Sequence, residues 1–126
     1  MKAVVSTILF GSFLVIIFDT LASLFSLHFQ INYGWFGFGS LLIYIYVGFC
    51  CAKYGSLLWS AIGGGILGLV DSTIGWYISW IIGPGNPGVE ISAPEIFATI
   101  IFVTATTIPF GFLGGLFNRW LRRQIS

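Results

Sequence analysis

The sequence predicts an all-α integral membrane protein with four transmembrane helices in an antiparallel bundle. Of its 126 residues, 57% are hydrophobic and only 7% are charged, whereas soluble domains carry about 25% charged residues. Apolar stretches of 18 residues or more, with short connections, recur four times, and such a stretch can cross a hydrocarbon core of about 30 Å. The chain is too short for a soluble domain besides, so residues 1–126 are predicted to form one transmembrane domain.

The first two apolar stretches predict helices over about 3–27 and 35–52. Lys2 followed by an apolar run is also the pattern of a secretory signal peptide. The apolar pattern nevertheless continues to Leu27, past the small residues where cleavage would be expected, which favours a transmembrane helix. Asp19 is the only charged residue within this first helix.

The third stretch predicts a continuous helix over 56–82, and it is the longest uninterrupted apolar run. Glycines are concentrated in its first half and aromatic residues in its second, and Asp71 is its only charged residue. The connection over 53–55 is so short that the second and third helices are expected to be antiparallel neighbours.

The fourth helix is predicted over 94–117, after a loop rich in glycine and proline at 83–89. Ser92 and Glu95 have the spacing of a capping box, in which the two side chains bond to the exposed backbone of the first helical turn. Pro109 lies inside the predicted helix and is expected to kink it or weaken one turn.

Charge distribution predicts the orientation in the membrane. With four crossings, every basic residue falls on one side: Lys2, Lys53, Arg119, Arg122 and Arg123. The other side carries Glu90 and Glu95. Because basic residues are enriched in cytoplasmic segments, both termini are expected in the cytoplasm and the protein in the cytoplasmic membrane. A net charge of +1 argues against a nucleic-acid partner.

Two pairs of short segments indicate an internal repeat. Residues 18–20 resemble 70–72, each with a central aspartate, and residues 48–49 resemble 111–112. A parallel repeat of two helical hairpins, related by an axis along the membrane normal, would explain both matches. Chance similarity between apolar segments is the other interpretation.

Small residues recur every four positions along the third and fourth helices. Such stripes let helix backbones approach closely within a membrane. The sequence does not decide whether this glycine-zipper pattern packs inside one chain or across a homo-oligomer, and a pore lining is a further alternative. The candidate packing residues are Gly64, Gly68, Gly75, Gly111 and Gly115.

The two intramembrane acids are the only residues in the sequence that suggest a specific chemical role. Asp19 and Asp71 each lie on the small, polar face of their helix, about 22–24 Å from the inner end at 1.5 Å per residue. No basic residue lies at that depth, so they form a candidate proton or cation site, with Ser23 and Ser72 as neighbouring hydroxyls. Structural hydrogen bonding to serine or threonine is the alternative.

The sequence holds no recognisable catalytic set, phosphate-binding loop or metal-ligand cluster, so we expect neither an enzyme nor a cofactor. The first expectation is a non-catalytic structural or accessory protein of the bilayer, which packs through its glycines with copies of itself or with other membrane-protein subunits. The alternative is a small proton- or cation-coupled transporter or channel that uses Asp19 and Asp71.

Overall fold

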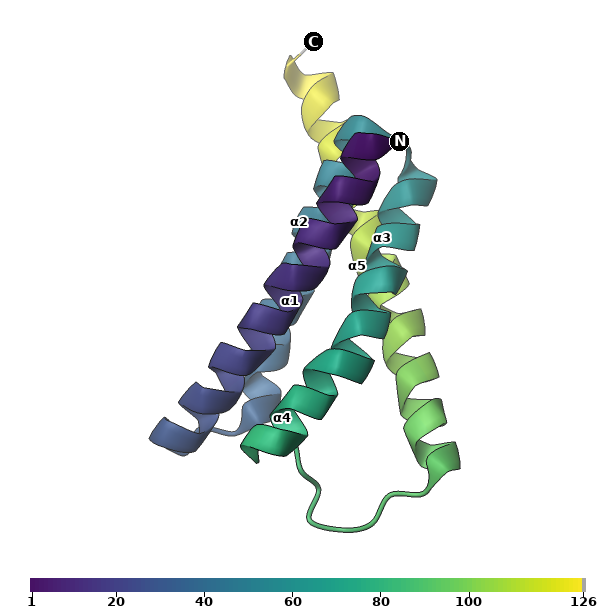
Figure 1. Ribbon diagram of the computed structural model, residues 1–126. Coiled ribbons are helices and arrows are strands. Elements are labelled where there is room, and N and C mark those ends of the chain that lie inside the picture. Colours follow the sequence, from purple (N-terminus) through teal and green to yellow (C-terminus); the bar gives the residue numbers. More distant parts are fainter. Residues whose placement is uncertain (126) are drawn as a thin grey trace.

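The computed structural model describes residues 1–125, and within that range every regular element is a helix. Four helical stretches are long and apolar enough to cross a membrane: Lys2–Phe29, Tyr33–Tyr54, Leu57–Ile82 and Ala93–Ile125. The two chain ends lie at one end of the molecule, and the loop between α4 and α5 lies at the other (Figure 1). The predictions of an all-helical fold and of four membrane-compatible helices are confirmed.

A tight turn connects the first two stretches. The helix α1 (Lys2–Phe29) ends at Gln30, which adopts a left-handed conformation with φ of 53°. The side chain of Asn32 then accepts a hydrogen bond from the backbone two residues on and begins a 3-10 turn, η1 (Tyr33–Phe36). This turn leads directly into α2 (Gly37–Tyr54) and brings η1 back over the end of α1.

The third stretch is not the single regular helix predicted over 56–82. It consists of α3 (Leu57–Val70), a π-helical segment η2 (Asp71–Gly75) and α4 (Trp76–Ile82). A π-helical turn holds more residues than an α-helical turn, and such segments occur frequently at functional sites. The irregularity begins at the acidic residue that the sequence singled out.

The helix α5 (Ala93–Ile125) is longer than the predicted 94–117. At its start, the backbone N–H and the hydroxyl of Ser92 donate to Glu95 Oε2 at 2.8 and 2.6 Å. The glutamate half of the capping box is therefore formed, whereas the serine hydroxyl bonds the carboxylate instead of the helix backbone. Pro109 lies inside α5 without ending it.

Side chains in the last turns of α5 explain its extra length. The Asn118 amide donates to the carbonyl of Phe49 at 3.1 Å, and the Arg122 guanidinium donates to the carbonyl of Lys53 at 3.2 Å. Lys53 belongs to the last turn of α2, whose carbonyls have no partner within that helix, whereas Phe49 lies one turn earlier. The polar tail thus remains helical because it caps a neighbouring helix.

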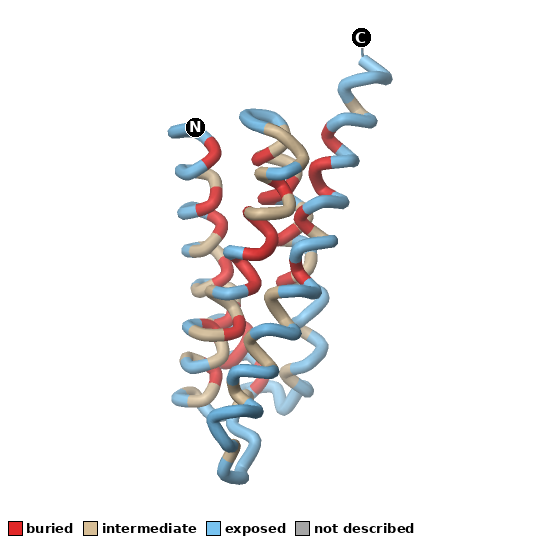
Figure 2. The backbone as a smooth tube through the Cα atoms, turned by 90° about the vertical axis from the view of Figure 1, so that its right-hand side faces the viewer, coloured by how far each residue is buried: buried red, intermediate tan, exposed pale blue. Residues whose placement is uncertain are grey.

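Packing is uneven along the molecule. The buried apolar cluster lies between α1, α2 and α3 and consists of Val4, Ile8, Val15, Tyr44, Val47, Cys51 and Leu67. In α5, every buried residue lies at Thr107 or beyond, and residues 93–106 are exposed or half-buried (Figure 2). The second half of α5 therefore packs on α2 and α3, while its first half diverges from α4 (Figure 1).

Glycines make the contacts of α5 with its neighbours unusually close. A Cβ added at Gly111 would lie 2.8 Å from the Cα of Gly64, and one added at Gly64 would lie 2.6 Å from the carbonyl oxygen of Thr107. Gly68 and Gly115 also face across α3 and α5. These predicted packing positions therefore meet inside one chain, and no second copy is needed to explain them.

The sequence interpretation missed two glycines and misassigned a third. Gly48 of α2 and Gly114 of α5 also lie against backbone atoms of the facing helix, so α2 belongs to the same close packing. Gly75 does not contact a neighbouring backbone in this way. Its missing side chain leaves room for a carboxyl group, as described next.

Candidate functional site

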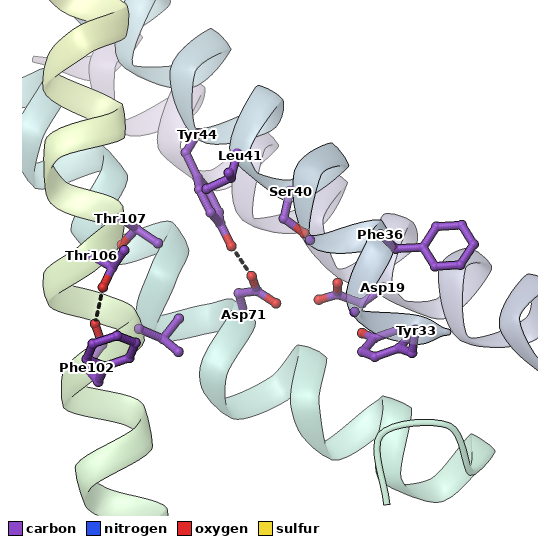
Figure 3. A pocket seen from close by; sticks show the side chains of 13 residues that line it. Asp19, Tyr33, Phe36, Ser40, Leu41, Tyr44, Asp71, Phe102, Thr106 and Thr107 are labelled. Atoms are coloured by element: carbon purple, nitrogen blue, oxygen red, sulfur yellow. Dashed lines mark hydrogen bonds between the residues drawn. The ribbon is translucent and has the colours of Figure 1, made fainter. Parts of the chain in front are cut away.

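The two predicted acids lie next to each other. Asp19 comes from α1 and Asp71 from the first position of η2, and their carboxyl groups point toward one another (Figure 3). A Cβ added at Gly75 would collide with Asp19 Oδ2 and would lie 3.1 Å from Asp71 Oδ1. Glycine at position 75 is thus what allows the two carboxyl groups to share one space.

The acids differ in their hydrogen bonding. The hydroxyl of Tyr44 donates to Asp71 Oδ2 (Figure 3). Asp19 is only 2% exposed, and its Oδ2 lies beside the Asp71 carboxyl, to which it is hydrogen-bonded only while one of the two acids holds a proton. The buried hydroxyl of Ser23, one helical turn along α1, lies beside the hydroxyl of Tyr33. Buried polar groups usually have partners because leaving them without one costs free energy, so this corner is prepared for a ligand or a proton.

Tyr33 covers the pair from η1. Its hydroxyl lies near Asp19, Ser23 and Ser79. No basic residue comes near, because all five lie at the end of the molecule that carries the chain termini. The acids therefore face each other with hydroxyl groups and aromatic rings around them, and with no cation from the described chain.

A cavity of about 280 Å³ opens beside the acids, between α2 and α5. Its wall is mostly apolar and aromatic, with hydroxyl groups from both helices. The lining residues that matter here are Asp19, Tyr33, Ser40, Leu41, Tyr44, Asp71, Phe102, Val103, Thr106 and Thr107 (Figure 3).

A second cavity, of about 220 Å³, shares Tyr33, Asp71 and Val103 with the first. It continues toward Trp76 and Thr99, where α4 and α5 diverge. The space beside Asp71 therefore extends in two directions along α5.

Sequence reasoning gave the two acids matching depths and left open whether they face each other, and it missed some of their neighbours. Ser72 is buried, but its hydroxyl donates to the carbonyl of Leu69 at 3.3 Å, and its side chain lines the second cavity and not the first. Tyr33 and Tyr44 were missed as site residues. A tyrosine hydroxyl inside a membrane helix requires a partner, and that requirement was the available signal for Tyr44.

Two carboxyl groups in one low-dielectric space cannot both ionise without a large repulsion. A proton held by the pair, or a cation bound between them, removes that repulsion. Among residues 1–125, no third histidine, cysteine, aspartate or glutamate joins the pair to form a metal-binding cluster. The arrangement is suited to reversible binding of one positive charge.

The chain matches no protein-family model, no curated protein and no solved structure. Any assignment of function therefore depends on the geometry of the acid pair and on the chemistry of the cavity around it.

Proposed function

We propose that the protein is a small proton- or cation-coupled transporter or channel in which Asp19 and Asp71 hold the translocated ion. The observation that carries the proposal is the pair of carboxyl groups: Asp19 is buried, and its carboxyl lies beside that of Asp71 at the edge of a cavity. Acids within membrane helices are costly, and they typically mark ion pathways.

The proposed membrane arrangement is an antiparallel four-helix bundle with both termini in the cytoplasm. It is supported by the basic residues, which gather at the end that carries the termini, and by the acidic residues Glu90 and Glu95 at the opposite end. In this orientation the acid pair and its cavity lie in the outer half of the membrane.

The proposed arrangement includes a repeat of two helical hairpins. If an approximate twofold axis relates the hairpins, residues near the axis must contact their own equivalents. Both pairs of matched positions satisfy this condition, because Asp19 faces Asp71 and a Cβ at Gly48 would collide with the backbone of Gly111. The acid pair would then be the place where two equivalent helices meet.

The topology predicts opposite labelling of two engineered cysteines, in a background that lacks Cys50 and Cys51. Asn86→Cys, in the outer loop, is expected to react with a membrane-impermeant maleimide in intact cells. Gln124→Cys, near the C-terminus, is expected to react only after the membrane is permeabilised. The reverse labelling pattern would refute the proposed orientation.

Removal of either acid is expected to abolish transport. Asp71→Asn and Asp19→Asn keep the shape of the side chain but remove its ability to ionise, so the site can no longer exchange a positive charge. Purified protein in liposomes is tested for proton, sodium and potassium flux, and both variants should fall to the level of empty liposomes.

Glu90→Gln is the matched control for that experiment, because it makes the same acid-to-amide change in the exposed outer loop. It is expected to transport like the unsubstituted protein. The proposal fails if the unsubstituted protein carries no flux of any ion, or if the asparagine variants transport as well as Glu90→Gln.

A non-catalytic accessory subunit is the second candidate function. It is favoured by the first half of α5, which has no buried residue and presents exposed side chains such as Phe97, Ile101 and Phe102. A further membrane protein, or a second copy, would cover this surface. In that case Asp71→Asn would preserve function, and substitutions at Phe97 and Ile101 would release the partner in mild detergent.

A further inference from the structure

We infer, on the basis of the proposed function, that the cation bound at this site is a monovalent organic ammonium ion that exchanges with one proton. Two features carry the inference: the composition of the wall around Asp19 and Asp71, and the charge that the acid pair can hold. Of these, the aromatic and aliphatic part of the wall is not needed for transport of a proton or of an alkali metal ion.

The wall of the cavity suits an alkylated cation. The rings of Tyr33, Tyr44 and Phe102 and the aliphatic side chains of Leu41 and Val103 line it. Aromatic ring faces attract ammonium groups whose charge is spread over alkyl substituents, and the substituents themselves gain by leaving water.

A hard metal ion requires several oxygen ligands arranged around it; calcium, for example, takes six to eight. Here one oxygen of Asp71 already accepts from Tyr44, and no third acidic residue among those described approaches the pair. The remaining carboxyl oxygens lie on one side of the cavity, and the opposite side, on α5, presents Phe102 and Val103 together with Thr106 and Thr107. Both threonine hydroxyls donate to carbonyls of their own helix. An ion with an apolar half and a charged half fits this asymmetry.

The size of the space also fits a small organic ion. At about 30 Å³ for each molecule of liquid water, the first cavity has room for about nine waters. An alkali ion would share that volume with several waters, whereas an ammonium centre with several short alkyl groups would itself contact both the acids and the rings.

The charge of the pair predicts a fixed exchange. The titratable groups that face the cavity are Asp19 from α1, Tyr33 from η1, Tyr44 from α2 and Asp71 from η2, and α5 contributes only threonines and apolar residues. With one proton shared by the two acids and with both tyrosines neutral, the site has a net charge of −1. If the monocation takes the place of the shared proton between the two carboxylates, one proton leaves for each ion bound, and the net charge of the site stays at −1.

The second cavity provides a route to this site from the membrane. Its wall runs from Asp71 and Tyr33 to Trp76 on α4 and Thr99 on α5. Amphiphilic cations concentrate near the membrane surface, so a lateral opening would admit them. Trp76 also places a fluorescent group close to the proposed ligand.

The test measures binding of tetraethylammonium to the purified protein in detergent. We expect a saturable change in tryptophan fluorescence, together with release of one proton per bound ion into weakly buffered solution. Equal concentrations of sodium or potassium chloride should produce neither signal. Asp71→Asn should abolish both signals, whereas Glu90→Gln should preserve both.

Two further variants test the role of the rings. Tyr33→Phe retains the ring and should bind tetraethylammonium within about twofold of the unsubstituted protein, whereas Tyr33→Leu should bind it about fivefold or more weakly. If Tyr33→Leu does not elute as folded protein, Phe102→Leu makes the same test at a position that is 72% exposed.

The outcomes separate this inference from the proposed function. Proton, sodium or potassium flux that depends on Asp71, without any binding of tetraethylammonium, would refute the inference of an organic cation. It would leave the proposed transport function supported. Binding of tetraethylammonium with proton release, but no flux of any tested ion including tetraethylammonium, would support the inference of an organic cation. It would refute the proposed transport function. Equal binding of sodium and tetraethylammonium would also overturn the inference.

Discussion

Gly111→Ala is expected to prevent α5 from packing on α3 and to reduce the stability of the whole molecule. A Cβ at this position would lie 2.8 Å from the Cα of Gly64 and 2.9 Å from its backbone nitrogen. Backbone atoms cannot rotate away as a side chain can, so the helices must separate. Overpacking typically costs about 1–3 kcal/mol, and the loss of neighbouring contacts along α5 adds to that cost.

For Gly111→Ala we measure the melting temperature in detergent, with tryptophan fluorescence as the signal for unfolding. The fraction of monodisperse protein is measured alongside. Gly37→Ala is the matched control, because no atom lies within 4 Å of a Cβ at that position and its backbone is right-handed helical. Equal melting temperatures for the two variants would contradict the close packing of α3 and α5.

Gly75→Ala is expected to stop transport without altering either acid. The added methyl group would occupy the place of Asp19 Oδ2 and crowd Asp71 Oδ1, so the carboxyl groups could no longer share one space. Flux in liposomes should fall as far as it does in Asp19→Asn. Gly75 touches no ion itself in this scheme, and its role is to position the pair.

Gly65→Ala is the appropriate comparison for Gly75→Ala. It lies in the same membrane-spanning stretch, and its added methyl group would meet only the side chain of Ile108, at 3.1 Å. We expect Gly65→Ala to transport normally or nearly so. Undiminished flux in Gly75→Ala would show that the contact between Asp19 and Asp71 is not required.

The helices and the matching positions of the two acids could be predicted because they depend on residues that are close together in the sequence. The length of an apolar run directly indicates whether a helix can cross a membrane. Counting residues from the helix ends, at a fixed rise per residue, gave Asp19 and Asp71 about the same depth in the membrane. The small residues one turn away from each acid indicated which face it occupies. Together these observations were sufficient to predict that the acids could meet.

The remaining features depend on contacts between distant segments. The π-helical segment at Asp71 changes the hydrogen-bond pattern, which apolar periodicity does not report. Tyr33 lies in the predicted turn, and only the path of η1 brings it back over Asp19. The polar residues after 117 continue the helix because Asn118 and Arg122 reach carbonyls of α2, 69 residues away in sequence.

The change in packing along α5 has a mechanical consequence. Pro109 cannot donate the backbone hydrogen bond that would normally hold the preceding turn, and it lies where the buried part of α5 begins. Across the cavity, η2 is a second departure from regular α-helical bonding. Regular helical hydrogen bonding is thus interrupted on both sides of the acids, at Pro109 in α5 and at η2. We therefore expect α4 and the first half of α5 to bend more easily than the parts of α3 and α5 that pack through glycines.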